Sequence, residues 1–454
     1  MFVFIVMLLI VAVAIIIRQL NSRKQERAIE STDNKLGAEW LDAKNDLKNV
    51  RSAVLYENIT EGLPIGKERS VDEIVGLLKE TDADLIFRGF WRWGVVPESP
   101  QDIPPEIVEL YAERMKIRPE QVPLLAEKSG HNYAELEKRI SAIKKEKPGI
   151  IFAGAIPAQR VNRIDKNDIT GKVYTTEETW AMALDPEKWN IQKDGKPFTK
   201  EEFQSLFADW HGWAESGQYD REKVEAYFPD ITNPDFQDLL LSWAERQIDA
   251  GADAIWIDGL PQTSIFRLLA KDKNPQAVKD LYEAGERIVG KIHKYGELKG
   301  RRIYVGSWGI PLDYIEGMPY LPASIDFVTI SPTDREVLDK KLGESREKIS
   351  HTRNLYGNTP IFAFIDWGVD QSPMVNFSQR LNKYEQRDLL GIFDESFAKD
   401  GVNFIYPLHG GYMGKGKVTT KLSFGKYRNY DSLAPEFETY DTIKALANKK
   451  TIGE

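Results

Sequence analysis

Two aspartates stand at the ends of short apolar runs, where a charged side chain needs a specific reason. Asp258 follows the apolar run in the segment WIDG, and Asp366 has the same setting in the segment FIDWG. Such an aspartate can be structural and cap the amides of the following loop. Two carboxyl groups on one face can instead cleave a glycosidic bond, one as proton donor and the other as nucleophile or base. Asp258 and Asp366 are therefore the first catalytic candidates.

Other polar and aromatic residues follow further apolar runs. Asp334 is a third candidate acid, although a place in the first turn of a capped helix also explains it. Glu57 can contact a sugar hydroxyl or pair with Arg88. Asp230 can orient the substrate or simply be a turn residue. His409 can hydrogen-bond the substrate, but a lone histidine is more often structural. Indole faces complement the apolar faces of sugar rings. The candidate substrate-binding residues are Glu57, Arg88, Trp91, Trp93, Asp230, Trp308, Trp367 and His409.

Short β-branched and aromatic runs alternate with amphipathic stretches from residue 54 onward, a pattern typical of a parallel sheet with helical crossovers. Capping signals at Ser70, Asn233 and Thr333 mark helix starts. Eight strands are predicted at Val54–Ile59, Leu85–Trp91, Gly149–Ala155, Ala254–Asp258, Ile303–Trp308, Phe327–Ser331, Ile361–Trp367 and Asn403–Leu408. Nothing after the first strand resembles the phosphate-binding glycines of doubly wound sheets. The expected fold is a (β/α)8 TIM barrel, with its active site at the carboxyl ends of the strands.

Two stretches are longer than a helical crossover requires. One runs from about 92 to 147 after the second strand, and the other from about 157 to 229 after the third. The second is rich in aromatic residues. Long loops on the catalytic face of a barrel usually shape or cover the site. We expect the 157–229 insertion to cover the substrate.

Composition excludes several classes of function. The 454 residues carry 61 Lys and Arg against 70 Asp and Glu, a net charge of −9, which argues against a nucleic-acid partner. No cysteine is present, so disulfides, Cys-ligated zinc and thiol nucleophiles are excluded. The five histidines form no HxH or HExxH pair. We expect a chemistry that needs neither a metal nor a cofactor.

The chain begins with an uncharged apolar run. Residues 2–17 carry no charge, proline or glycine, and extension through Leu20 approaches the width of a bilayer. We predict a membrane segment over 1–20 that contacts lipid through 2–20, a polar linker over 21–51 and a barrel over 52–454. The basic residues after the segment favour a cytoplasmic barrel, whereas a polymeric external substrate favours the opposite side. The expected location is the membrane, with the orientation open.

One block of the sequence resembles a known family. Residues 227–259, YFPDITNPDFQDLLLSWAERQIDAGADAIWIDG, resemble a segment of barrel glycoside hydrolases, with the closest likeness to α-galactosidase-like and α-glycosidase-like enzymes. The resemblance implies that Asp258 is the nucleophile. The family's acid/base belongs to strand six, which would place it at Asp334. On its strand-end position we prefer Asp366 as the acid, with Asp334 second.

These observations predict a membrane-anchored glycoside hydrolase that acts on a carbohydrate, with an α-linked bond as the expected target. One alternative is a barrel that binds saccharide without catalysis. Another is an enzyme for a phosphorylated metabolite, because a glycine-rich run, HGGYMGKGK at 409–417, follows the eighth strand, where barrels often bind phosphate. The oligomeric state stays open.

Overall fold

The computed structural model describes residues 46–60, 69–214, 217–260, 262, 275–309, 323–368, 372–422 and 425–452. The predicted membrane segment and all of the linker before residue 46 lie outside these ranges, so both stay predictions. Among the described helices, none is long and apolar enough to cross a bilayer.

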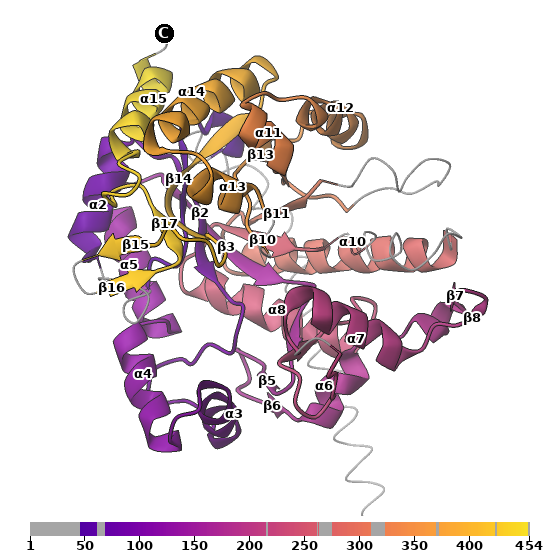
Figure 1. The fold of residues 1–454 in the computed structure, drawn as a ribbon. Helices are drawn as coiled ribbons and strands as arrows, with labels where there is room; N and C mark the ends of the chain where they lie inside the picture. The colour runs from indigo at the N-terminus through magenta and orange to yellow at the C-terminus, as the bar shows by residue number, and fades with distance from the viewer. Residues whose placement is uncertain are drawn as a thin grey trace, which may run out of the picture. The chain divides into compact units, whose positions relative to one another are not determined.

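Eight parallel strands form a closed barrel, as predicted. They pair in chain order, and the last strand pairs back with the first, so the sheet has no parallel edge. Figure 1 shows them surrounded by helices. The strands are β1 (Ala53–Tyr56), β2 (Leu85–Trp91), β3 (Ile151–Pro157), β10 (Ala254–Asp258), β11 (Tyr304–Trp308), β12 (Phe327–Ile330), β13 (Ile361–Ala363) and β14 (Asn403–Tyr412).

Several strand ends differ from the prediction. β1 ends before Asn58, whose φ of +56° turns the chain out of the sheet. β13 ends at Ala363, so Asp366 lies on the loop that follows the strand. β14 continues to Tyr412 because β17 (Asn429–Asp431) pairs with it in the antiparallel sense.

Helices cover the barrel from outside. The predicted caps at Ser70, Asn233 and Thr333 are confirmed, since each side chain accepts a hydrogen bond from a backbone N–H in the first turn. α8 and α10 lie side by side (Figure 1). The helices are α2 (Val71–Glu80), α3 (Pro105–Met115), α4 (Val122–Ser129), α5 (Tyr133–Glu146), α6 (Thr176–Met182), α7 (Lys200–His211), α8 (Pro234–Asp249), α10 (Pro275–Leu298), α11 (Asp334–Asp339), α12 (Glu344–Tyr356), α13 (Pro373–Gln379), α14 (Lys383–Lys399) and α15 (Tyr440–Ile452).

The barrel interior is largely aromatic. Trp256 is fully buried at its centre, and its ring contacts Phe87 edge-on at 5.4 Å between centroids. Phe364 lies 5.0 Å from Phe87. These large rings fill the barrel beneath the carboxyl ends of the strands. The polar residues at those ends therefore pack on a rigid apolar layer, which we call the floor.

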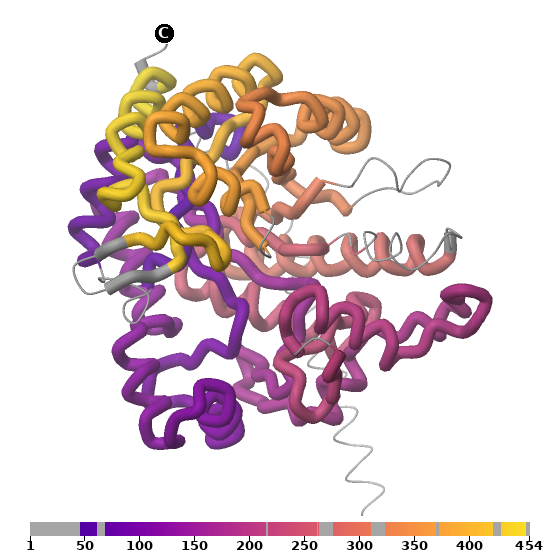
Figure 2. Tube along the Cα trace, viewed as in Figure 1, coloured from indigo at the N-terminus to yellow at the C-terminus, as the bar shows by residue number. Residues whose placement is uncertain are grey.

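The chain between β3 and β10, traced from violet to magenta in Figure 2, has secondary structure of its own. Its part before α8, residues 158–229, contains α6, α7 and three two-stranded ladders, and we call this part the excursion. Its tryptophans Trp180, Trp189 and Trp213 are buried, whereas Trp210 is half exposed. The ladders are β4 (Val161–Asn162) with β9 (Ala226–Tyr227), β5 (Asp165–Lys166) with β6 (Val173–Tyr174), and β7 (Gln192–Lys193) with β8 (Lys196–Pro197).

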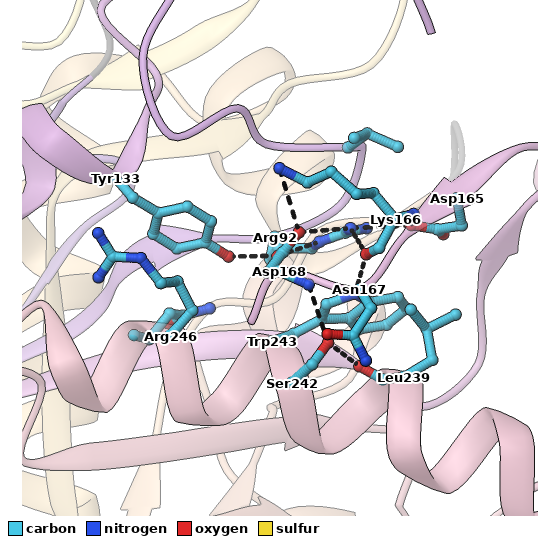
Figure 3. Close-up of polar contacts among 12 residues, drawn as sticks. Arg92, Tyr133, Asp165, Lys166, Asn167, Asp168, Leu239, Ser242, Trp243 and Arg246 are labelled. Atoms are coloured by element: carbon cyan, nitrogen blue, oxygen red, sulfur yellow. Dashed lines mark hydrogen bonds and ion pairs between the residues drawn. The ribbon is translucent and has the colours of Figure 1, made fainter. Parts of the chain in front are cut away.

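A buried ionic cluster attaches the excursion to the barrel. Arg92, directly after β2, donates to Asp165 at 2.8 Å and to Asp168 at 3.1 Å, and its guanidinium lies 4.1 Å from the Trp243 ring centroid. Tyr133 donates to Asp168 at 2.6 Å. Figure 3 shows this cluster between α5 and α8. Since both carboxylates are completely buried, their charges depend on Arg92 for compensation.

Candidate active site

Asp258, the last residue of β10, is only 8% exposed. Both of its carboxylate oxygens accept hydrogen bonds, one from the Trp308 indole at 2.7 Å and the other from the Gln159 amide at 2.6 Å. Burial raises the pKa of Asp258, while Arg88 and these two donors oppose the rise. Neutral donors on both oxygens hold the carboxylate in one orientation.

Asp366 lies on the loop after β13 and has a different environment. Its backbone is fixed by hydrogen bonds to Ser331 and from Met374. Burial raises the pKa of the Asp366 carboxyl to about 7, and the charges of Asp258 and Glu57 add to the rise. Arg88 and a backbone hydrogen bond act in the opposite direction. Asp366 therefore shares an electrostatic environment with Asp258, yet holds its proton to near neutral pH.

Arg88 reaches this site because β2 carries a bulge. Leu85 and Phe87 face the barrel interior and Ile86 faces outward, so strict alternation would send Arg88 outward. The β2–β3 register shifts between Ile86 and Phe90, and Arg88 has a φ of +54°. Bulges of this kind re-aim a side chain and occur near active sites. Here the bulge turns the guanidinium toward the open end of the barrel at the carboxyl ends of the strands, which we call the mouth.

The Arg88 guanidinium is buried among aromatic rings and carboxylates. It lies 3.9 Å from the Trp367 ring centroid and 4.4 Å from that of Trp91, and one of its nitrogens is 3.4 Å from the Glu57 carboxylate. It also lowers the pKa of Asp258 and of Asp366. Arg88 is thus the cation that three carboxyl groups at the mouth have in common.

Replacing Arg88 by methionine is expected to raise the pKa of both aspartates, because the positive charge that favours their ionised forms is removed. Any activity that needs ionised Asp258 and protonated Asp366 should then have its pH optimum displaced upward. The pH dependence of kcat/KM measures this shift. Arg88→Lys keeps the charge and should leave the optimum nearly in place; equal profiles for Arg88→Met and the native chain would contradict the role given to Arg88.

Glu57 and the glycine-rich run meet at the end of β14. Glu57 donates its backbone N–H to the His409 carbonyl, and its carboxylate accepts the Gly411 N–H at 2.9 Å. Gly410 has a φ of +103°, and a Cβ there would come within 2.3 Å of the Glu57 Cβ. The run therefore packs against a carboxylate, which occupies one of the N–H groups that a phosphate would need.

His409 has a fixed orientation. Its Nδ1 lies 2.8 Å from a carboxylate oxygen of Asp431, and Arg69 binds the same oxygen at 2.6 Å. Hydrogen bonds and charge from His409 and Arg69 outweigh burial and lower the pKa of Asp431. Since an ionised Asp431 can only accept, His409 carries a proton on Nδ1. The ring also packs against Tyr56, with centroids 4.9 Å apart.

The four predicted tryptophans are partly buried: Trp308 bonds Asp258, Trp91 and Trp367 contact Arg88, and Trp93 lies behind Trp91. Trp91 stacks on Trp93 with centroids 5.3 Å apart, and Trp308 stacks on Phe364 at 5.1 Å. Trp367 covers Arg88. Their partial exposure leaves apolar surface at the mouth, while contacts with Arg88, Phe364 and one another keep the rings in place.

Asp334 and Asp230 differ in their contacts: one Asp334 carboxylate oxygen is buried without a hydrogen-bond partner, whereas the Asp230 carboxylate is bonded on both oxygens. Asp334 opens α11 after the capping residue Thr333, and burial raises its pKa while Arg380 is the charge that opposes the rise. Asp230 accepts from Lys188 at 2.8 Å and from the Thr232 backbone at 2.8 Å. Within the described ranges, no hydrogen bond or ion pair joins either residue to Asp258 or Asp366. Arg88 thus links Glu57, Asp258 and Asp366, and among the described residues no such link to this group is seen for Asp334 or Asp230.

Three further residues belong to the site. Gln159 binds Asp258, Trp256 forms the floor, and Asp431 orients His409. Gln159 stands just after β3, so its strand-end position could have revealed it. Asp431 lies far along the chain, and no local pattern indicates its role. In the part of the chain that the structure describes, no group of three or more His, Asp or Glu side chains could hold a metal ion.

Neither a protein-family model nor a curated protein matches the sequence. Among solved structures, the glycoside hydrolase domain of PelA from Pseudomonas aeruginosa is 9% identical and aligns over 78% of this chain and 94% of that one, with a TM-score of 0.36. An α-amylase from H. orenii is 12% identical over 89% and 82%, with a TM-score of 0.42. Amy13B of Eubacterium rectale is 11% identical over 90% and 81%, with a TM-score of 0.45. At these scores the likeness carries no inference about activity.

Proposed function

We propose that the chain hydrolyses an O-glycosidic bond, with Asp366 as the general acid and Asp258 as the nucleophile or base. The observation that carries the proposal is the contrast between two neighbouring carboxyl groups. Burial raises the pKa of both carboxyl groups, that of Asp366 to about 7, but only Asp258 has side-chain donors on both oxygens that favour its ionised form. Two carboxyl groups with different environments can divide the acid and base roles of glycoside hydrolysis.

The surroundings of the pair support a saccharide as the substrate. Trp91, Trp308 and Trp367 offer apolar ring surface beside the carboxylates, and Glu57 and His409 offer polar atoms at the same rim. Sugar rings present both apolar C–H faces and hydroxyl groups, so a saccharide can contact the indole rings and the polar side chains at the same time. The α linkage is taken from the resemblance of residues 227–259, and the membrane anchor over 1–20 stays a prediction.

The pH dependence of kcat/KM tests the proposed roles. Asp366 must be protonated to act as an acid, so activity is expected to fall as pH rises through about 7, the pKa of its carboxyl. Asp258 must be ionised, so activity should also fall at low pH, and burial displaces this acidic limb above the ordinary aspartate range. The full-length chain would be assayed on the aryl glycoside that it cleaves fastest in a panel.

Asp366→Asn tests whether Asp366 or Asp334 is the general acid. An aryl glycoside with a very acidic leaving group needs little protonation, so the variant should retain turnover on that substrate and lose the alkaline limb. Asp334→Asn should keep the native profile. If Asp334→Asn removes the alkaline limb and Asp366→Asn does not, Asp334 is the acid and the proposed role of Asp366 is wrong.

A further inference from the structure

Aromatic rings and guanidinium groups form a continuous series from the reaction centre into the excursion. Arg88 contacts Trp91, Trp91 stacks on Trp93, and the Arg160 guanidinium lies 4.9 Å from the Trp93 ring centroid. Arg160 in turn lies 5.1 Å from the ring centroid of Trp213, a buried residue of the excursion. Arg160 is thus the member of the series that connects the barrel rings to the excursion.

Arg160 is held firmly in this place. Its side chain is 1% exposed, and it donates twice to Asn162, at 3.0 and 3.1 Å, and once to Glu225 at 2.5 Å. The planar guanidinium can lie flat on a ring while its edge donates hydrogen bonds, whereas a lysine ammonium is a point charge without such a face. Its sequence neighbour Gln159 binds Asp258. Gln159 and Arg160, at the start of the excursion, therefore contact Asp258 and Trp93, respectively.

We infer that Arg160 is a positioning residue for saccharide binding: it holds Trp93 against Trp91, which Arg88 and Trp256 already hold, and Trp93 forms the outer part of a wall that binds an oligosaccharide beyond the cleaved bond. The inference rests on the proposed glycosidase function. Trp91 contacts the central Trp256 at 6.0 Å between ring centroids, while Trp93 lies on the side of Arg160 and the excursion. A saccharide that reaches Trp93 extends away from Asp258, so a single sugar with an aryl leaving group does not need this wall.

Arg160→Met tests the inference without leaving a buried charge unpaired. Glu225 is part-exposed and keeps a second partner, Arg114, at 2.8 Å. In the full-length chain, KM for an oligosaccharide is expected to rise about tenfold, the loss expected for one well-ordered ring contact. The kcat for that substrate and the KM for the aryl monoglycoside should stay unchanged. Arg160→Lys should behave like Arg160→Met, since lysine keeps the ion pair with Glu225 but loses the planar contact.

Glu225→Gln is the matched control, because it removes the ion pair and leaves the stack. It should bind the oligosaccharide as the native chain does. The reverse pattern, with Glu225→Gln impaired and Arg160→Lys unaffected, would assign the effect to the ion pair and overturn the inference. An unchanged oligosaccharide KM in Arg160→Met would also overturn it.

Circular dichroism gives a readout that needs no substrate. Stacked indoles couple their electronic transitions, and the difference between the native chain and Trp93→Phe defines the signal of the Trp91–Trp93 pair. Arg160→Met should lose most of that signal at an unchanged helix content. If the signal is retained, Arg160 does not position the pair. If it is lost in a chain that cleaves no glycoside, the positioning stands and the proposed function fails.

Discussion

Asp258→Asn is expected to lower kcat by about 10⁴-fold or more, the scale seen when a residue that acts directly in catalysis is removed. Asparagine has nearly the same shape but carries no charge, so it can neither attack the anomeric carbon nor activate water. Saccharide affinity should change little, because the aromatic wall is untouched. The measurements are kcat on the preferred glycoside and the dissociation constant of a saccharide by calorimetry.

The local geometry allows this variant to fold. Trp308 can still donate to the asparagine oxygen, and the Gln159 amide can rotate so that its oxygen accepts from the new NH₂ group. Asp230→Asn is a matched control, a buried aspartate whose partners are Lys188 and Thr232. It should retain turnover. Native kcat in Asp258→Asn would remove Asp258 from the mechanism.

Arg92→Met is expected to lower the free energy of unfolding by about 3–5 kcal/mol, the usual cost of leaving a buried charge without its partner. Asp165 and Asp168 have completely buried side chains and would lose their direct ionic contacts with Arg92. Lys166, whose ammonium is 3.8 Å from Asp168, compensates only in part. Methionine has a similar length and still covers Trp243, so lost packing contributes little.

Urea unfolding of the full-length chain measures this effect. Arg335→Met is the control, because Arg335 is 90% exposed and pairs with Asp339 on the surface of α11. Its expected cost is below about 0.5 kcal/mol. Equal midpoints for the two variants would mean that the Arg92 cluster contributes no more than a surface pair. A selective loss of protection from proteolysis in the excursion would locate the weakened region.

The barrel could be predicted because its strands are short and strongly apolar and alternate with amphipathic helices. The segment from Asn233 to Asp258 illustrates this: its cap, its helix α8 and its strand β10 all occur where the local pattern indicates them. Strand ends were less predictable. The chain leaves β1 at Asn58 through a positive φ, which side-chain alternation does not reveal.

The arrangement of the site was predictable only in part. Asp258 and Asp366 are recognisable as charges after apolar runs. The orientation of Arg88 depends on a bulge, and strict alternation would have sent its side chain toward the helices. Asp431 reaches His409 from a strand that pairs with β14 only in the folded chain. Such contacts join residues that no local periodicity connects.

The products that the full-length chain forms from its preferred glycoside give the most direct test of the proposed catalytic pair. Proton NMR follows the anomeric signal of the released sugar in the native chain and in Asp258→Asn, Asp366→Asn and Asp334→Asn. We expect the native chain and Asp334→Asn to release the sugar with one anomeric configuration. Asp258→Asn should release none, and Asp366→Asn none from a substrate with a poor leaving group. Release by Asp258→Asn at the native rate would contradict the pairing of Asp258 with Asp366.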